Sequence, residues 1–589
     1  MAFLPTTVKE LEERGWNYVD VIFVSGDAYV DHPSFGCAVI CRYLEKAGYR
    51  VAVLAQPNWQ DDLRDFKKMG QPRLCFCVSS GCMDSMVNHY TAAKRKRSDD
   101  AYTAGGQSGF RPDRATSVYS EILKRLYPSV PVLIGGIEAS MRRLAHYDYW
   151  SDTLMPSVLL TSGADMLIYG MGEKVVERIC DELKAGRKIN EITDMEQTAY
   201  LCRKPNATKK AWADVFVPSF EQCRRDKKAQ AKSVCLFEKH SNKSDDERLI
   251  QKYEKEGVYV VVNPFDRGYS GEDLDNIYLL PFERKPHPKY VKRGTVPAFE
   301  MIKYSVNIHR GCFGGCAFCT IAAHQGKRII SRSRKSILRE IEIISKDKDF
   351  KGYLSDLGGP SANMYMMKGR NDELCRKCVR PSCLYPVLCK NMNNDHRPLL
   401  ELYEAVRKLP YIKKAFVGSG IRYDLFDKSD YFEVLCRHHV SGRLKVAPEH
   451  SSDRVLRQMR KMPFSQFVDL KKRFERINKK YGLNQQLIPY FISSHPACDM
   501  RDMVDLASQT AALGYRLQQV QDFTPTPMTI ATETYYTGTD IYTGEKVFTE
   551  KNPAAKQMQN RIFFWYKPEN RNWARNVFKK YGKQFPRQG

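Results

Sequence analysis

Short apolar segments that alternate with helical patterns constrain the fold of this chain more than any other feature. Each segment is apolar over most of its length, and the first two flank a helical pattern over residues 35–47. The segments are VDVIFVSG, RVAVLA, RLCFCVS (73–79), VPVLIGG (130–136) and ADMLIYG (164–170). Strands that are buried on both faces and separated by helices predict an open, parallel α/β sheet. We therefore expect a doubly wound, Rossmann-like domain over residues 1–190, with ligands at the carboxyl ends of its strands.

A second α/β series begins near Met301. Its strand candidates are YSVNI (304–308), GYLSD (352–356), KAFVG (414–418), RLKVA (443–447), QLIPY (486–490) and QQVQDF (518–523). Six strands with intervening helices predict a partial (β/α)6 barrel over residues 301–530, with chemistry at the carboxyl ends of its strands. The polar residues 191–300 are expected to form a bridging segment. A basic extension over 531–589 either wraps the barrel or is partly disordered.

Composition places the chain among cytoplasmic, soluble proteins. No run of about twenty apolar residues occurs, and the first residues lack the pattern of a secretory signal. Lys and Arg outnumber Asp and Glu by 94 to 68, a net charge of +26, which would attract nucleic acid or another polyanion. The basic residues are diffuse, with small clusters at 94–97, 327–335 and 579–580, so a well-solvated basic surface is the alternative.

One cysteine motif carries the chemistry. RGCFGGCAFC has the spacing CxxxCxxC and follows the first strand of the second series directly. Its glycines let the backbone fold tightly round a cluster. Three thiolates on a four-iron cube leave one iron without a protein ligand, so a substrate or cofactor can bind there. A zinc site is the alternative, although zinc sites usually offer a second CxxC or paired histidines. The motif cysteines are Cys312, Cys316 and Cys319.

This motif after a barrel's first strand resembles the signature of the radical S-adenosylmethionine (radical SAM) superfamily. GGIEASMRRLAHYDYWSD, SGIRYDLF, KVAPEHSSDRVLRQM and QDFTPTPMT are similar to the uncharacterised YgiQ family within it. The resemblance implies a [4Fe-4S] cluster whose open iron binds S-adenosylmethionine. Reductive cleavage then gives methionine and a 5′-deoxyadenosyl radical that abstracts hydrogen from a substrate. It also implies an electron donor such as flavodoxin or ferredoxin.

The resemblance carries four further residues to the S-adenosylmethionine site. Phe318 takes the aromatic position near adenine, and Gly358 and Gly359 match the glycine motif that receives the amino group of the cofactor. Pro360 stands where an acidic residue is common, which puts that contact in doubt. Glu449, at the end of the fourth strand, corresponds to a polar residue on the ribose or carboxylate.

The first domain resembles the cobalamin-binding-type fold that precedes many such barrels. The ligating DxHxxG pattern is missing, because Asp31 and His32 are adjacent and Gly36 is one residue too far. Both a base-off cobalamin without a histidine ligand and a cobalamin-free relic of the fold remain open.

A second cysteine group lies in an insertion over residues 371–391. Four thiols in so short a loop favour an auxiliary iron-sulfur cluster or a structural zinc over free thiols. They are Cys375, Cys378, Cys383 and Cys389.

The leading hypothesis is thus a radical SAM enzyme whose substrate is RNA, a peptide or a small molecule. The alternative is a zinc-stabilised nucleic-acid-binding module without catalysis, in which all seven clustered cysteines are structural and the charge is the functional feature.

Overall fold

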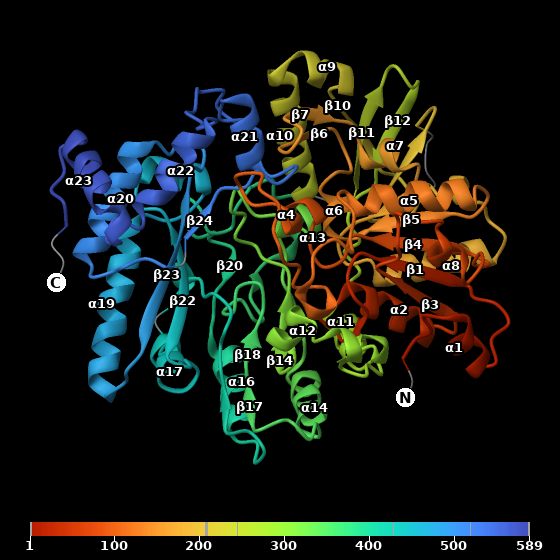
Figure 1. The fold of residues 1–589 in the computed structure, drawn as a ribbon, viewed down its shortest axis with the longest axis horizontal. Helices are drawn as coiled ribbons and strands as arrows, with labels where there is room; N and C mark the ends of the chain where they lie inside the picture. The colour runs from red at the N-terminus through yellow and green to blue at the C-terminus, as the bar shows by residue number, and fades with distance from the viewer. Residues whose placement is uncertain (1–2, 206–209, 244–245, 428, 519, 587–589) are drawn as a thin grey trace.

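The computed structural model describes residues 3–205, 210–243, 246–427, 429–518 and 520–586. Two α/β halves lie side by side, the first drawn in red to yellow and the second in green to blue (Figure 1). In the first half all five expected strands form, and they pair in parallel in the order β3-β1-β4-β5-β8. They are β1 (Val21–Ser25), β3 (Val51–Ala55), β4 (Cys75–Ser79), β5 (Val132–Gly135) and β8 (Met166–Ile168).

Both faces of this sheet are buried, as the apolar runs predict. One face packs against α2 (Gly36–Lys46) and α8 (Glu173–Lys184), and the other packs against α5 (Ala115–Leu126). The chain leaves β1 for β3 on one side and returns to β4 on the other. The order of the strands therefore reverses between β1 and β4, which makes a crevice at their carboxyl ends.

The segment 191–300 is more than the bridge that its polarity suggested. Four of its strands extend the first sheet to nine strands, with β9 antiparallel to β8. Polar side chains are accommodated there by pairing, because the guanidinium of Arg248 donates to Asp214 at 2.8 Å across neighbouring strands. The added strands are β9 (Thr198–Cys202), β10 (Ala213–Val217), β11 (Glu247–Tyr253) and β12 (Val258–Val262).

The second half contains strands at all six expected places. They run parallel in chain order, linked by ladders or, between the third and fourth, by a single bridge from Ile421 to Val446. GYLSD forms β17 (Tyr353–Leu354), which continues into β18 (Asp356–Gly358). The others are β14 (Ser305–Asn307), β21 (Lys414–Ala415), β22 (Arg443–Glu449), β23 (Gln486–Ser493) and β24 (Val520–Asp522).

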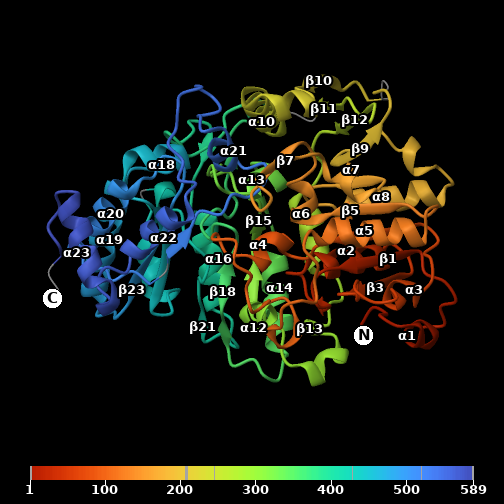
Figure 2. The same ribbon diagram turned by 45° about the horizontal axis from the view of Figure 1, so that its top comes forward.

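Helices cover the outside of these strands and share one apolar core with them. They are α14 (Arg334–Ser345), α16 (Arg397–Arg407), α17 (Tyr431–His438), α19 (Phe464–Tyr481) and α20 (Met500–Ala512). The C-terminal extension wraps the barrel with α21 (Ile530–Thr537), α22 (Pro553–Ile562) and α23 (Arg571–Lys580). Phe563 and Phe578 of this extension are fully buried in the same core. Figure 2 shows α22 and α23 against α19 and α20. No helix among the described residues is long and apolar enough to cross a membrane.

Candidate active site

The three motif cysteines lie on one loop at the carboxyl end of the first barrel strand, between β15 (His309–Arg310) and α13 (Ile321–Gln325). We call residues 311–320 the cysteine loop. Gly311 and Gly315 have positive φ, and a Cβ on either would lie about 2 Å from a backbone carbonyl oxygen of a neighbouring segment. The loop can therefore follow this path only with glycine at both positions.

The thiols of the loop influence one another's ionisation. Burial and the charge of Cys316 raise the pKa of Cys312, and together they raise that of Cys319 to about 12. The amide of Gly314 donates to Sγ of Cys312 at 3.4 Å. Thiols in this environment stay protonated at neutral pH unless a metal takes the place of the proton. The loop therefore has the donor set and the amide orientation that an iron-sulfur cluster requires.

In the described ranges, no three His, Cys, Asp or Glu side chains are grouped closely enough to hold one metal ion directly. This holds for the cysteine loop and for the second cysteine group alike, so it does not separate zinc from a cluster at either place. The zinc-stabilised module considered from the sequence finds no support in the comparisons with known proteins reported below.

Arg422 is a functional candidate that sequence reasoning missed. Its Nη1 donates to Sγ of Cys316 at 3.2 Å, while Nε and Nη2 donate to the carboxylate of Asp424 at 3.0 and 2.6 Å. Asn363 holds its backbone through hydrogen bonds of 2.8 and 2.9 Å. The buried guanidinium thus lies in hydrogen-bond contact with the sulfur of Cys316 and carries a positive charge. Its only sequence signal is its place in SGIRYDLF, after the third barrel strand.

The predicted glycine motif lies against the cysteine loop. A Cβ on Gly359 would meet the ring of His309 at 2.7 Å, and the carbonyl oxygen of Gly358 accepts from the amide of Ile308 at 2.8 Å. Ser361, which follows, brings its hydroxyl to 3.7 Å from Sγ of Cys312. The structure therefore brings this segment and the loop together at the carboxyl ends of the first two barrel strands.

Glu449 and Phe318, the other two predicted cofactor residues, have different partners. Glu449 ends β22 with a positive φ of 68°, is buried, and pairs with Nζ of Lys461 at 3.6 Å. Burial raises its pKa, which Lys461 and Arg422 partly offset. The ring of Phe318 meets that of His495 edge-on, with centroids 6.0 Å apart.

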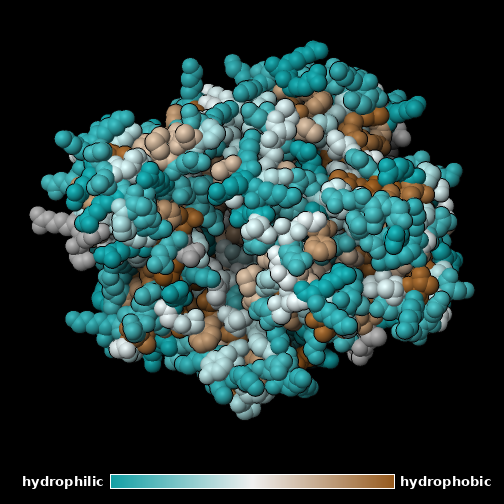
Figure 3. All heavy atoms as spheres, viewed as in Figure 1, coloured by the Kyte–Doolittle hydropathy of each residue, from teal (hydrophilic) through white to brown (hydrophobic). Residues whose placement is uncertain are grey.

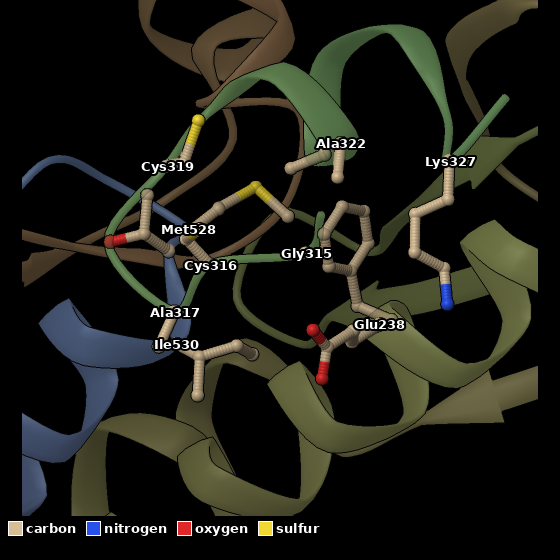
Figure 4. A pocket seen from close by; sticks show the side chains of 12 residues that line it. Glu238, Gly315, Cys316, Ala317, Cys319, Ala322, Lys327, Met528 and Ile530 are labelled. Carbon is tan, nitrogen blue, oxygen red and sulfur yellow. The ribbon is translucent and has the colours of Figure 1, made fainter. Parts of the chain in front are cut away.

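A narrow pocket adjoins the cysteine loop (Figure 4). Cys316 and Cys319 line one side, Met528 and Ile530 come from the segment that begins α21, and Glu238 comes from α10 (Lys227–Lys243). The amide of Ala531 in α21 donates to the carbonyl oxygen of Ala317 at 2.9 Å. The C-terminal extension is therefore part of the wall around the cysteines.

Comparison with known proteins assigns the chain to a family. A UPF0313 protein of Bacteroides thetaiotaomicron is 55% identical over 99% of this chain and 97% of its own length. The chain belongs to the UPF0313 family. This is the YgiQ family, so the resemblance seen in the sequence is confirmed. A UPF0313 protein of Methanocella arvoryzae is 46% identical over 96% of this chain and 93% of its own length.

Two family models match parts of this UPF0313 chain. Residues 3–305 match the radical SAM N-terminal model, and residues 518–585 match a domain of unknown function, DUF3362. The first match supports an enzyme of the radical SAM superfamily and leaves the reaction unspecified. Among solved structures, the radical S-adenosylmethionine methyltransferase TsrM of Kitasatospora setae is similar at a TM-score of 0.47 and 15% identity, over 87% of this chain and 77% of its own. That similarity is too distant to transfer a ligand or a substrate.

In this UPF0313 protein a cleft of about 540 Å³ lies where the two halves meet. Its floor is the carboxyl edge of the first sheet, including Gly136 and Gly170. Its other wall includes Thr320, the last residue of the cysteine loop, and His324 in α13. The space-filling view is hydrophilic over most of its surface and hollowed near its centre (Figure 3). The cleft thus connects the crevice of the sheet with the cysteine loop.

The departure from the DxHxxG pattern has a structural counterpart. Asp31 is fully buried and forms an ion pair with Arg42. Nδ1 of His32 accepts from the amide of Ser34 at 3.2 Å, and the ring packs edge-on to Phe299. His32 is therefore buried in the interior, and among the described residues its Nε2 has no hydrogen-bond partner.

The second cysteine group packs against the cysteine loop. The amide of Cys383 donates to the carbonyl oxygen of Phe313 at 3.2 Å, and Cys375 accepts from the amide nitrogen of Asn391 at 3.2 Å. Burial raises the pKa of Cys383 to about 11. Cys383 and Cys389 also contact a small apolar cluster around Phe313. This packing was not predicted from the sequence. Because the apolar cluster covers part of Cys383 and Cys389, free thiols at these two positions are less unfavourable than expected.

Proposed function

We propose that this chain is a radical SAM enzyme that holds a [4Fe-4S] cluster through Cys312, Cys316 and Cys319. The observation that carries the proposal is the cysteine loop itself. The loop carries three thiols at the carboxyl end of a barrel strand. One accepts a hydrogen bond from the amide of Gly314 and another accepts one from the guanidinium of Arg422. When bound, the cluster supplies the electron that cleaves the sulfonium of S-adenosylmethionine. An external reductant such as flavodoxin or ferredoxin would provide that electron.

The residues around the loop would position the cofactor. The backbone of Gly358 and Gly359 would receive the amino group at the carboxyl end of β18, where Ser361 approaches Cys312. Phe318 would pack near the adenine. Glu449 would accept a hydrogen bond from the ribose, and Lys461 partly offsets the cost of burying its charge. The extension that contacts Ala317 would exclude water from the reacting atoms.

We also propose a second metal centre on Cys375, Cys378, Cys383 and Cys389, either an iron-sulfur cluster or zinc. The amide of Arg380 donates to Sγ of Cys378 at 3.4 Å, the kind of contact that stabilises a metal thiolate. A base-off cobalamin would fit only in the cleft between the two halves, and a cobalamin-free relic of the fold is the alternative.

The test is S-adenosylmethionine cleavage by anaerobically purified, reduced protein, followed as 5′-deoxyadenosine by mass spectrometry. Replacing Cys312, Cys316 or Cys319 with Ala should remove both cluster iron and cleavage. Cys202→Ala, at a half-buried cysteine of β9, is the matched control and should retain both. Full cleavage activity in any of the three loop variants would exclude the proposal.

A further inference from the structure

A group of lysines gathers where the C-terminal extension meets the β6 (His146–Asp148) to β7 (Thr153–Met155) hairpin of the first half. Nζ of Lys227 and Nζ of Lys551 both donate to the carbonyl oxygen of Tyr536, at 2.9 and 3.5 Å. Two ammonium groups on one carbonyl repel each other. A bound anion would reduce this repulsion. We call Lys94, Lys227, Lys551 and Lys556 the lysine patch.

Lys556 lies beneath the others. It is 8% exposed and donates to the hydroxyl groups of Tyr535 and Tyr149 at 3.0 and 3.4 Å. Nζ of Lys94 lies 4.7 Å above the ring of the same Tyr149, and Nζ of Lys551 lies 5.4 Å above that of Tyr535. Burial, together with the charge of Lys94, lowers the pKa of Lys556 to about 8. The four ammonium groups are thus packed through shared tyrosines.

Carboxylates do not neutralise the patch. Over the described ranges, no Asp or Glu oxygen lies within 4.0 Å of any of these four ammonium groups. The carboxylates that act on them from farther away are Asp152, Asp522 and Glu550. Lys94 is also the first residue of the exposed basic run 94–97. A row of this many cations suits a polyanion better than a single carboxylate.

The patch is joined to the cysteine loop by a series of aromatic rings. The ring of His495, which meets Phe318 of the loop, lies 5.0 Å from that of Phe523. Phe523 in turn lies 6.1 Å from Tyr535, and Tyr535 lies 6.0 Å from Tyr149. The patch and the cysteine loop are therefore linked through the packed core of the second half, to which Tyr149, Phe523 and Tyr535 belong.

We propose that the lysine patch binds the phosphate backbone of a single-stranded nucleic acid, and that this strand is the substrate. The inference rests on the proposed radical SAM function. The three cysteines are half-buried beside a narrow pocket, so a base must leave its stack to reach them, and this costs least in a single strand. The phosphates on either side of that base then lie over Lys94, Lys227 and Lys551, with the charge of Lys556 beneath.

The test uses anaerobically purified holoprotein and a fluorescent oligouridylate of about ten nucleotides, with binding followed by anisotropy. Each phosphate contact contributes about 0.7 to the slope of log K against log salt for single strands. Replacing Lys94, Lys227 and Lys551 with Gln should therefore lower the slope by about 2. Because these three lysines are exposed, the variant should melt like the parent protein.

The matched control removes three equally exposed lysines from distant helices: Lys9, Lys346 and Lys408, each changed to Gln. The proposal predicts an unchanged slope for this control. An equal loss in both variants, or an unchanged slope in the patch variant, overturns it. Polyglutamate that binds as tightly as the oligouridylate also overturns it, in favour of an acidic protein partner.

A deoxyuridine oligonucleotide of the same length distinguishes RNA from DNA. Patch-dependent binding of either oligonucleotide supports the proposal, and the one that binds more tightly shows whether the strand is RNA or DNA. Binding is read without any cleavage of S-adenosylmethionine. If the protein cleaves S-adenosylmethionine but binds the oligonucleotide equally well with and without the patch lysines, only this inference is refuted. Patch-dependent binding in a protein that never cleaves it refutes only the radical SAM proposal.

Discussion

The guanidinium of Arg422 donates a hydrogen bond to the sulfur of Cys316, 106 residues earlier in the chain, at 3.2 Å. Asp424 fixes the orientation of the guanidinium, and both side chains are buried. A cation and a hydrogen-bond donor beside a cluster thiolate stabilise the reduced, more negative state. Arg422 is therefore expected to act as a positioning residue that raises the reduction potential of the cluster.

Replacing Arg422 with Gln together with Asp424 by Asn removes this contact without leaving a buried charge unpaired. We expect the variant to keep its iron but to show a lower reduction potential in a potentiometric titration. Hydrogen bonds to charged groups contribute about 1.5–3 kcal/mol, so cofactor cleavage should slow about ten- to a hundredfold. The exposed pair Arg397 and Asp395, changed in the same way, is the control. Equal potentials in both double variants would rule out this role.

The second cysteine group should add metal beyond the first cluster. Iron, sulfide and zinc are counted in the parent protein and in a variant with Cys375, Cys378, Cys383 and Cys389 all changed to Ala. We expect the variant to lose either about four irons or one zinc while the cysteine loop keeps its cluster. A double variant of Cys202 and Cys235 to Ala should lose neither. Identical metal content throughout would mean that the insertion holds no metal.

Gly315 should tolerate no side chain. Its φ is +60°, and a Cβ would lie 2.2 Å from the carbonyl oxygen of Pro381 in the second cysteine segment. Gly315→Ala should therefore displace the loop, cost about 1–3 kcal/mol of stability and lower the iron content. Gly36→Ala, at an exposed glycine with no atom within 4 Å of the added Cβ, should change neither. Normal iron content in the Gly315 variant would contradict the path described for the loop.

Glu533 should make stability depend on pH. It is fully buried in α21, accepts from the side-chain amide of Gln230 at 3.1 Å, and burial raises its pKa to about 7. Because this pKa lies above the unfolded value, the stabilisation is complete below about pH 4.5 and is lost as the pH rises to about 7.

Glu533→Gln removes that titration. Across this window the free energy of unfolding of the parent should fall by up to about 3 kcal/mol relative to the variant. Urea unfolding of both proteins at several pH values measures the difference. Parallel pH profiles would show that Glu533 does not titrate in this range.

Much of the strand framework could be predicted, because its strands are locally apolar and regularly spaced. RLCFCVS and ADMLIYG, for example, became central strands with both faces covered. The extension of the sheet through β9–β12 was not predicted. Arg248 and the polar residues around it in β11 are typical of exposed surface, and their partner Asp214 is 34 residues away in the chain. Local pattern does not reveal such a long-range ion pair.

The candidate site divides in the same way. The cysteines were predicted from a contiguous motif whose chemistry follows from its spacing. Arg422 and the lysine patch depend on contacts between segments separated by 100 to 400 residues, such as Lys556 with Tyr149. The local sequence around these residues does not predict which distant residues they contact.

The contact between Ala531 and Ala317 has a consequence for how the protein is made. Translation exposes the cysteine loop about 200 residues before α21, the segment that closes over it. At about 5–20 residues per second the loop waits on the order of 10–40 s on the ribosome without this cover. The proposed cluster would be inserted most easily during that interval. The finished extension would then pack against the loop and cover it.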